Sequence, residues 1–169
     1  MTAEHGTDPD EAARFWDDLY RSRPVPWGER ANPLLVEVAG DLALADRVTA
    51  EQHDLPRSFP AGAFDLVSAQ YLHSFFAFPR TEVLRTAAHA LRPGGLLLVV
   101  DHGSIAPWSW NQDPDTHFPT PAEIATELAL DPVQWPVVRA DMPRRAATGP
   151  HGETATVTDN VLVLRRAAG

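Results

Sequence analysis

The chain has 169 residues, enough for one hydrophobic core, so a single domain over residues 1–169 is expected. Apolar residues make up 44% of the sequence, which excludes an intrinsically disordered chain. The net charge of −9 argues against a general nucleic-acid binder, because phosphate contacts need clustered cations. Cysteine is absent and no run of eighteen residues is apolar, so neither disulfides nor a membrane span are expected.

The first residues are neither basic nor apolar, so no secretion signal is expected and the sequence predicts a cytoplasmic protein. All 14 basic residues are arginine, and Ala and Pro are abundant, which is typical of a bacterial gene of high GC content. The 7 histidines show no metal-ligand spacing, so no metal site is expected.

Two helices are expected in the N-terminal part, residues 1–46. Residues 8–11 (DPDE) are typical of a helix start, and apolar side chains then follow at helical spacing until the prolines of residues 23–26. Asn32 and Pro33 open a second helix from Leu34 to about Leu44. Its expected buried stripe is Leu34, Leu35, Val38 and Leu42.

Strands and helices alternate in the remaining part, residues 47–169. Strands are expected at 47–53, 64–69, 96–100, 137–140 and 155–164, and helices at 80–91 and 120–130. Residues 120–123 (TPAE) form a capping box, and residues 54–62 and 103–119 are loops. Alternation indicates an α/β fold, a mostly parallel sheet with helices on both faces. A turn at 149–152 (GPHG) predicts a C-terminal antiparallel hairpin that joins the last two strands.

One stretch of this pattern resembles a known family. Residues 64–67 (FDLV), a helix, and residues 91–100 (LRPGGLLLVV) resemble the fourth strand, the next helix and the fifth strand of class I S-adenosylmethionine-dependent methyltransferases. Residues 52–55 (QHDL) resemble the end of the family's third strand. Residues 15–20 (FWDDLY), 27–28 (WG) and 32–35 (NPLL) resemble the lead-in helices of small bacterial members. The resemblance implies a Rossmann-like sheet.

The family's glycine-rich cofactor loop has no counterpart, since no Gly-x-Gly occurs in the sequence. The first two strands would belong at residues 41–46, which are too few to hold them. A truncated sheet of family strands four, five, seven and six is therefore expected, with residues 64–69 at its edge. Either residues 47–53 or another subunit must cover that edge, and a homodimer is expected.

The resemblance implies a set of cofactor-binding residues. Asp54, next to Leu55, is the candidate adenine contact, and the alternative is a carboxylate that makes a turn. Ala69, Gln70 and Tyr71 end a strand at the edge of the sheet where open α/β folds bind ligands, and the alternative is a simple connection to the next helix.

Candidate catalytic residues are His73 and His102, which follow adjacent strands and suit a general base. The alternative for each is an ordinary surface or hydrogen-bonded histidine. Candidate substrate-binding residues are the aromatic side chains Tyr20, Trp27, Trp108 and Trp110, for which core packing is the alternative.

Two functions are consistent with the sequence. The first is an S-adenosylmethionine-dependent methyltransferase-like protein that acts on a small molecule, with impaired cofactor binding. The second is a non-catalytic methyltransferase remnant that serves as a binding or dimerisation module.

Overall fold

The computed structural model describes residues 33–39, 51–74 and 76–169, and some residues of a helix nearer the N-terminus. Those helical residues are Glu11, Arg14, Phe15, Asp17, Asp18 and Arg21. The ring of Phe15 meets the ring of Phe76 edge to face, with centroids 5.5 Å apart. In the part of the chain that the structure describes, no helix is both long and apolar enough to cross a membrane.

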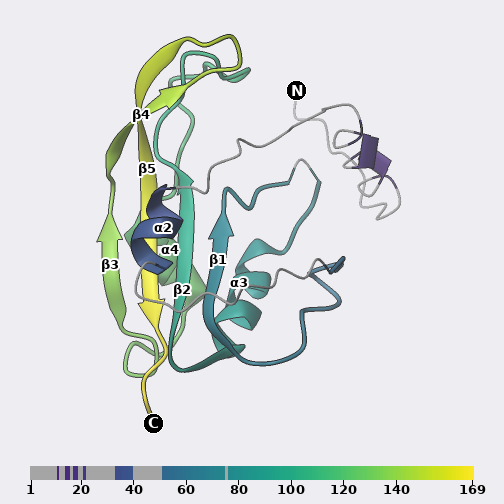
Figure 1. Cartoon of the computed structure of the whole chain (residues 1–169), viewed down its shortest axis with the longest axis vertical. Helices are drawn as coiled ribbons and strands as arrows, with labels where there is room; N and C mark the ends of the chain where they lie inside the picture. The colour runs from purple at the N-terminus through teal and green to yellow at the C-terminus, as the bar shows by residue number, and fades with distance from the viewer. Residues whose placement is uncertain are drawn as a thin grey trace.

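A five-stranded sheet forms the centre of the structure, in the order β1-β2-β5-β3 with β4 paired to β5 (Figure 1). Strands β1 and β2 are parallel, whereas β5 runs antiparallel to β2, β3 and β4. This is the order expected from the resemblance, and the α/β fold class is confirmed. The expectation of a mostly parallel sheet is wrong, because only one of the four strand pairings is parallel and the antiparallel strand β5 is central. The strand bounds are β1 Phe64–Gln70, β2 Leu91–His102, β3 Val137–Asp141, β4 Arg144–Thr148 and β5 Thr154–Arg165.

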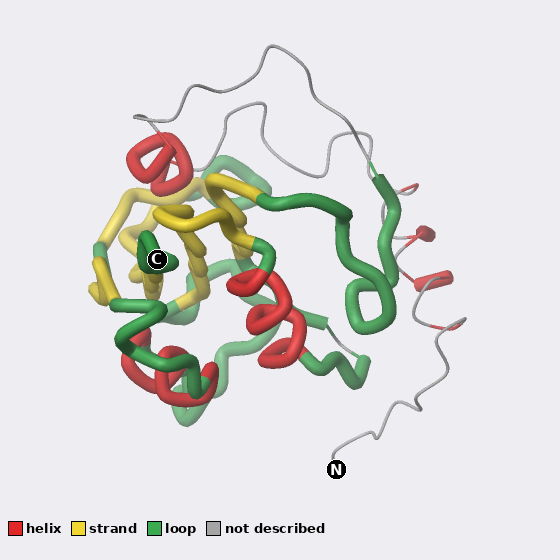
Figure 2. The backbone as a smooth tube through the Cα atoms, turned by 90° about the horizontal axis from the view of Figure 1, so that it is seen from below, coloured by secondary structure: helices red, strands yellow, loops and turns green. Residues whose placement is uncertain are grey.

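Helices cover both faces of this sheet (Figure 2). On one face α3 (Arg80–His89) and α4 (Pro121–Leu128) pack over a core that includes Leu97, Val99, Leu162 and Leu164. On the other face α2 (Pro33–Ala39) packs over Leu98, Val100, Val161 and Val163. Alternate residues of β2 and β5 thus face different helices, as the period of a strand requires.

The central part of β2 is apolar without interruption because both of its faces are covered. Leu97, Leu98, Val99 and Val100 are each 0% exposed. A continuous apolar run is typical of a strand buried on both faces, and burial of each such side chain stabilises the fold by about 1.5–3 kcal/mol. The expectation that residues 96–100 form a buried strand is confirmed.

Helix α4 begins as its sequence predicts. Thr120 is the N-cap: its hydroxyl accepts a hydrogen bond from the Glu123 amide at 3.2 Å, and the Glu123 carboxylate accepts one from the Thr120 amide at 2.7 Å. This reciprocal pair is a capping box, and Pro121 occupies the first helical turn.

The structure corrects three expectations about the elements. The turn at residues 149–152 joins β4 to β5, so the strand before the hairpin is β4 and not β3. Helix α3 ends at His89, and its C-cap is Ala90 in right-handed conformation. The expected last helical residue, Leu91, is already the first residue of β2. Residues 51–53 are loop and not strand; the rest of the expected strand at 47–53, and Leu42, lie outside the described residues.

Candidate functional site

Tyr71 follows β1 with a left-handed backbone, at φ 51°, which is uncommon for a non-glycine residue. The amide of Tyr71 donates to the Val100 carbonyl at 2.7 Å, and the next turn closes when the His73 amide donates to the Tyr71 carbonyl at 2.9 Å. The left-handed residue interrupts the alternation of the strand, so Tyr71 packs on the same face as Leu66, five residues earlier. Tyr71 is thereby directed onto the α2 face, above the end of β2.

The Tyr71 hydroxyl is held by two charged residues of the hairpin. It donates to Asp159 Oδ1 at 3.0 Å and accepts from Arg145 Nη2, also at 3.0 Å. Arg145 donates through Nε to Asp159 Oδ2 at 2.6 Å, and Asp159 is only 1% exposed. Burial and the neighbouring Asp159 carboxylate raise the pKa of Tyr71, so its hydroxyl remains protonated.

His102, the last residue of β2, lies flat on this tyrosine. The two ring centroids are 4.4 Å apart with an interplanar angle of 26°, and the ring of His73 lies 6.4 Å from that of His102 at 20°. Burial lowers the pKa of both histidines, and the proximity of His73 lowers the pKa of His102 further. Both imidazoles are therefore neutral at neutral pH and can accept a proton.

His73 also approaches a buried carboxylate on the other face of β2. Its Nε2 atom lies 3.4 Å from Asp101 Oδ1, while Arg80 at the start of α3 binds the second oxygen, Oδ2. Arg80 is fixed in turn because its Nε donates to the Leu72 carbonyl at 3.1 Å. Asp101, Arg80 and His73 thus form a connected group at the carboxyl ends of β1 and β2.

The structure therefore brings both predicted catalytic histidines and Tyr71 together. The other two residues predicted with Tyr71 lie beside them at the end of β1. Ala69 packs into the core on the α3 and α4 face, and Gln70 donates to the Ser68 hydroxyl at 3.0 Å.

Asp54 and Leu55 lie in a turn. The Asp54 carbonyl accepts hydrogen bonds from the Arg57 and Ser58 amides, both at 2.7 Å. Its carboxylate pairs with Arg57 at 3.1 Å and is half exposed. This geometry matches the alternative interpretation, a carboxylate that makes a turn.

The predicted aromatic residues have different positions. Trp108 packs against the β4–β5 turn, where a Cβ atom added to Gly149 would lie 2.7 Å from its ring. Trp110 is 83% exposed. Tyr20 and Trp27 lie outside the described residues.

Sequence reasoning missed Asp101, Arg80, Asp159 and Arg145, the charged residues of the site. The signal in the sequence that could have identified two of them is that Asp101 and Asp159 each adjoin an apolar run. Asp101 follows five apolar residues, and Asp159 precedes five residues of which four are apolar. A carboxylate in a buried strand needs a hydrogen-bond or ion-pair partner, but that partner can be far away in the sequence. Tyr71, for example, is separated from Asp159 by 88 positions.

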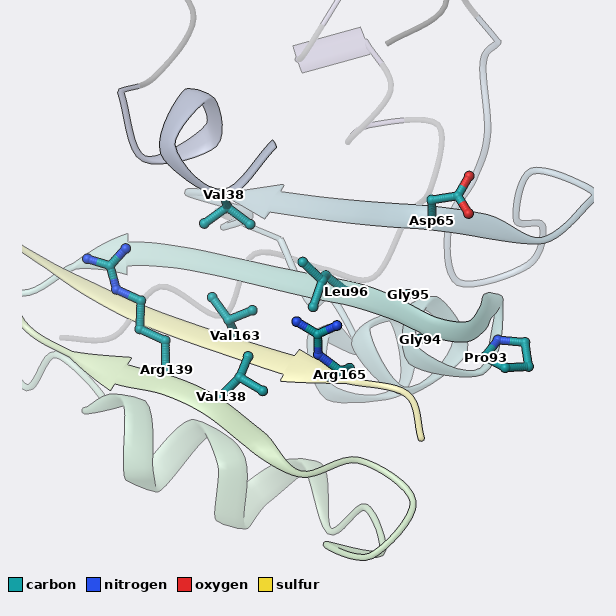
Figure 3. Close-up of a pocket in the computed structure, with 10 residues that line it drawn as sticks. All are labelled: Val38, Asp65, Pro93, Gly94, Gly95, Leu96, Val138, Arg139, Val163 and Arg165. Atoms are coloured by element: carbon teal, nitrogen blue, oxygen red, sulfur yellow. The ribbon is translucent and has the colours of Figure 1, made fainter. Parts of the chain in front are cut away.

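A hollow of about 610 Å³ opens elsewhere on the α2 face (Figure 3). Its floor includes Leu96 and Val163, and its rim includes Asp65 and Arg165. The hollow lies at the edge of the sheet where β1 and β2 begin and β5 ends, whereas open α/β sheets bind ligands at the carboxyl ends of their parallel strands. The titratable cluster around Tyr71 is therefore the better candidate site.

The residues of this site do not fit the cofactor that the resemblance implies. Gly103 follows β2, but a Cβ atom there would lie 2.6 Å from Asn160 Oδ1, so the protein's own packing accounts for this glycine. The sequence holds no Gly-x-Gly that could approach a methionine moiety closely. Among the described side chains, no group of three or more His, Asp or Glu residues is placed to hold a metal ion.

Comparisons with known proteins add two structural likenesses. No protein-family model matches the chain, and no curated protein matches it in sequence. A structure from work on the conversion of a disulfide bond into a thioacetal group during echinomycin biosynthesis is 20% identical over 64% of this chain, with a TM-score of 0.43. TehB from Haemophilus influenzae is 11% identical over 78% of this chain, with a TM-score of 0.44. The chain spans about half of each, 51% and 45%, and at these scores neither likeness bears on activity.

Proposed function

We propose that the chain is a methyltransferase-like domain that binds the small molecule that would accept the methyl group. By itself it binds the cofactor S-adenosylmethionine only weakly. The strand order β1-β2-β5-β3 supports the family resemblance. The observation that carries the proposal is the gathering of Tyr71, His73 and His102 at the carboxyl ends of β1 and β2. Ring faces and neutral imidazoles are suited to small organic molecules.

Few dedicated side chains are required for this function. In a methyl transfer, binding aligns the acceptor and excludes water, and such positioning provides most of the rate enhancement. The residues of this chain would hold the acceptor molecule through ring contacts and hydrogen bonds.

Ligand-observed NMR with a library of ring-containing fragments tests the proposal. We expect saturation transfer to several fragments from the native chain and its loss in a His73→Ala/His102→Ala double variant. The matched control is His117→Ala/His151→Ala, which removes two histidines on exposed segments. If the control variant loses the fragments as well, the site is not at the carboxyl ends of β1 and β2.

The alternative function is a non-catalytic binding or dimerisation module. It is favoured by the position of β1, which pairs only with β2 among the described strands. An apolar strand at a sheet edge favours association with a second chain. Sedimentation at micromolar concentration tests the dimerisation role: a homodimer that binds no fragment favours it, and a stable monomer contradicts it.

A further inference from the structure

We propose that His73 is the hydrogen-bond and proton acceptor of this site, that Asp101 positions it, and that the site takes a neutral ring-bearing molecule through a ring hydroxyl. The inference rests on the proposed small-molecule site at the carboxyl ends of β1 and β2.

The first observation is a buried carboxylate oxygen without a hydrogen bond. The Asp101 side chain is 4% exposed, and Arg80 binds its Oδ2 atom. No hydrogen-bond partner for Oδ1 is found in the described part of the chain. The His73 Nε2 atom lies 3.4 Å away, so it is placed to satisfy this buried acceptor.

This contact decides which nitrogen of His73 is basic. A neutral imidazole carries one N–H, and a carboxylate can only accept, so the proton belongs on Nε2. The lone pair is then on Nδ1. The side chain of His73 is 51% exposed, so a ligand can reach it. A distance of 3.4 Å is long for a hydrogen bond, but catalytic contacts are often long before a ligand is bound.

The charges around the site favour a neutral ligand. The groups that act electrostatically on His73 are Asp101 of β2 and Arg80 of α3, with His102 of β2 stacked beside it. Arg80 is paired with Asp101, and Arg145 is paired with Asp159. Neither arginine is left to neutralise a carboxylate or phosphate on the ligand, whereas a ring hydroxyl needs only an acceptor.

The ring surfaces favour a flat ligand. Tyr71, His102 and His73 form a row of nearly parallel rings, with angles of 26° and 20° between neighbours. The Nδ1 lone pair lies in the plane of the His73 ring, so the ligand's hydroxyl would donate at the edge of His73 while the ligand's ring packs against a neighbouring ring face. If the proton is transferred, the ligand O–H bond breaks, an Nδ1–H bond forms, and the imidazolium is stabilised by the Asp101 carboxylate.

NMR of the full chain labelled with 15N-histidine tests the inference with phenol as the probe. We expect His73 to carry its proton on Nε2, and phenol to shift the Nδ1 resonance of His73. Anisole has no hydroxyl proton and benzoate is an anion, so both should bind about tenfold more weakly than phenol.

An Asp101→Asn variant extends the test to the positioning role. An amide can donate to Nε2, so the proton of His73 should move to Nδ1 and the response of Nδ1 to phenol should be lost. Asp54→Asn, which changes an exposed turn carboxylate, is the control and should behave as the native chain. The native-chain experiment needs no variant, so a failure of Asp101→Asn to fold leaves the test intact.

The possible outcomes separate this inference from the proposed function. A native His73 with its proton on Nδ1, or equal binding of phenol and anisole, overturns only the inference. If no ring compound shifts any resonance of His73 or His102, the proposed small-molecule site and the ligand class are both wrong.

Discussion

Arg145 of β4 and Asp159 of β5 form a two-point ion pair across the C-terminal hairpin, with Nε–Oδ2 at 2.6 Å and Nη2–Oδ1 at 3.3 Å. The Asp159 side chain is 1% exposed and that of Arg145 is 35% exposed. The pair links the hairpin to Tyr71, whose hydroxyl contacts both side chains. A strand that sequence patterning did not predict thereby fixes one wall of the candidate site.

Arg145→Met is expected to lower the free energy of unfolding by about 3 kcal/mol, near the low end for breaking a buried pair, because Asp159 would be left buried with only the Tyr71 hydroxyl. Arg92→Met is the matched control. It breaks a pair with Asp65 of similar length, 2.9 Å, but both side chains are more than half exposed, so a loss of no more than about 1 kcal/mol is expected. Urea unfolding of both variants measures the difference, and equal losses would contradict the assigned role of Asp159.

Two adjacent glycines in the first half of β2, Gly94 and Gly95, should respond differently to alanine. At Gly95 a Cβ atom would lie 2.8 Å from the Phe64 carbonyl oxygen and 3.0 Å from that of Arg92, so β1 and β2 would have to shift. At Gly94 no atom lies within 4 Å, and the cost is only that of a left-handed backbone, about 1–2 kcal/mol. Thermal melts of Gly95→Ala and Gly94→Ala test this order. A larger loss for Gly94→Ala would show that the two strands can move apart freely.

Stability should fall as the pH drops below about 6.5, the ordinary pKa of histidine. The pKa values of His73 and His102 are lowered in the folded chain, so the unfolded chain binds protons more readily in that range. No stability is lost above the unfolded pKa; the loss begins there and continues as the pH falls through the lower pKa of the folded chain. Denaturant midpoints at pH 7.5 and 5.5 should therefore differ less in His73→Asn/His102→Asn than in the native chain. An unchanged difference would show that other groups cause the loss.

The two tryptophans of the 103–119 loop should separate into a packing residue and an exposed one. Trp108→Ala is expected to destabilise the chain by about 3 kcal/mol, since its ring packs against the Gly149 turn. Trp110→Ala should change stability by less than about 0.5 kcal/mol, because the residue is 83% exposed. If Trp110 contributes to ligand binding, its replacement weakens fragment binding without loss of stability. Fluorescence-detected unfolding and the fragment titrations together assign each residue.

The elements with strong local signals were predictable from the sequence. The apolar run of β2, the capping box of α4 and the start of α2 at Pro33 were all predicted and are confirmed. Strand β4 was missed because its sequence, RRAAT, has no alternation of apolar residues. It is a strand because β5 offers it a partner along its whole length, from Arg144 opposite Thr158 to Thr148 opposite Thr154.

The candidate site was predictable only in part. His73, His102 and Tyr71 could be placed because they follow the expected strands, and the fold brings strand ends together. The left-handed backbone of Tyr71 has no signal in its residue type, since tyrosine rarely adopts it. The pairs between Asp101 and Arg80 and between Asp159 and Arg145 depend on tertiary packing, which a local pattern does not contain.

The central claim is that this domain has a binding site for a small molecule but lacks a binding site for the cofactor. Isothermal titration of the chain with S-adenosylmethionine tests this claim most directly. The absence of a Gly-x-Gly loop predicts no measurable heat of binding at micromolar concentrations of protein and cofactor. The His73→Ala/His102→Ala variant should give the same result, since these residues are assigned to the other ligand. Micromolar binding with one cofactor per chain, located at the carboxyl ends of β1 and β2, would contradict the account.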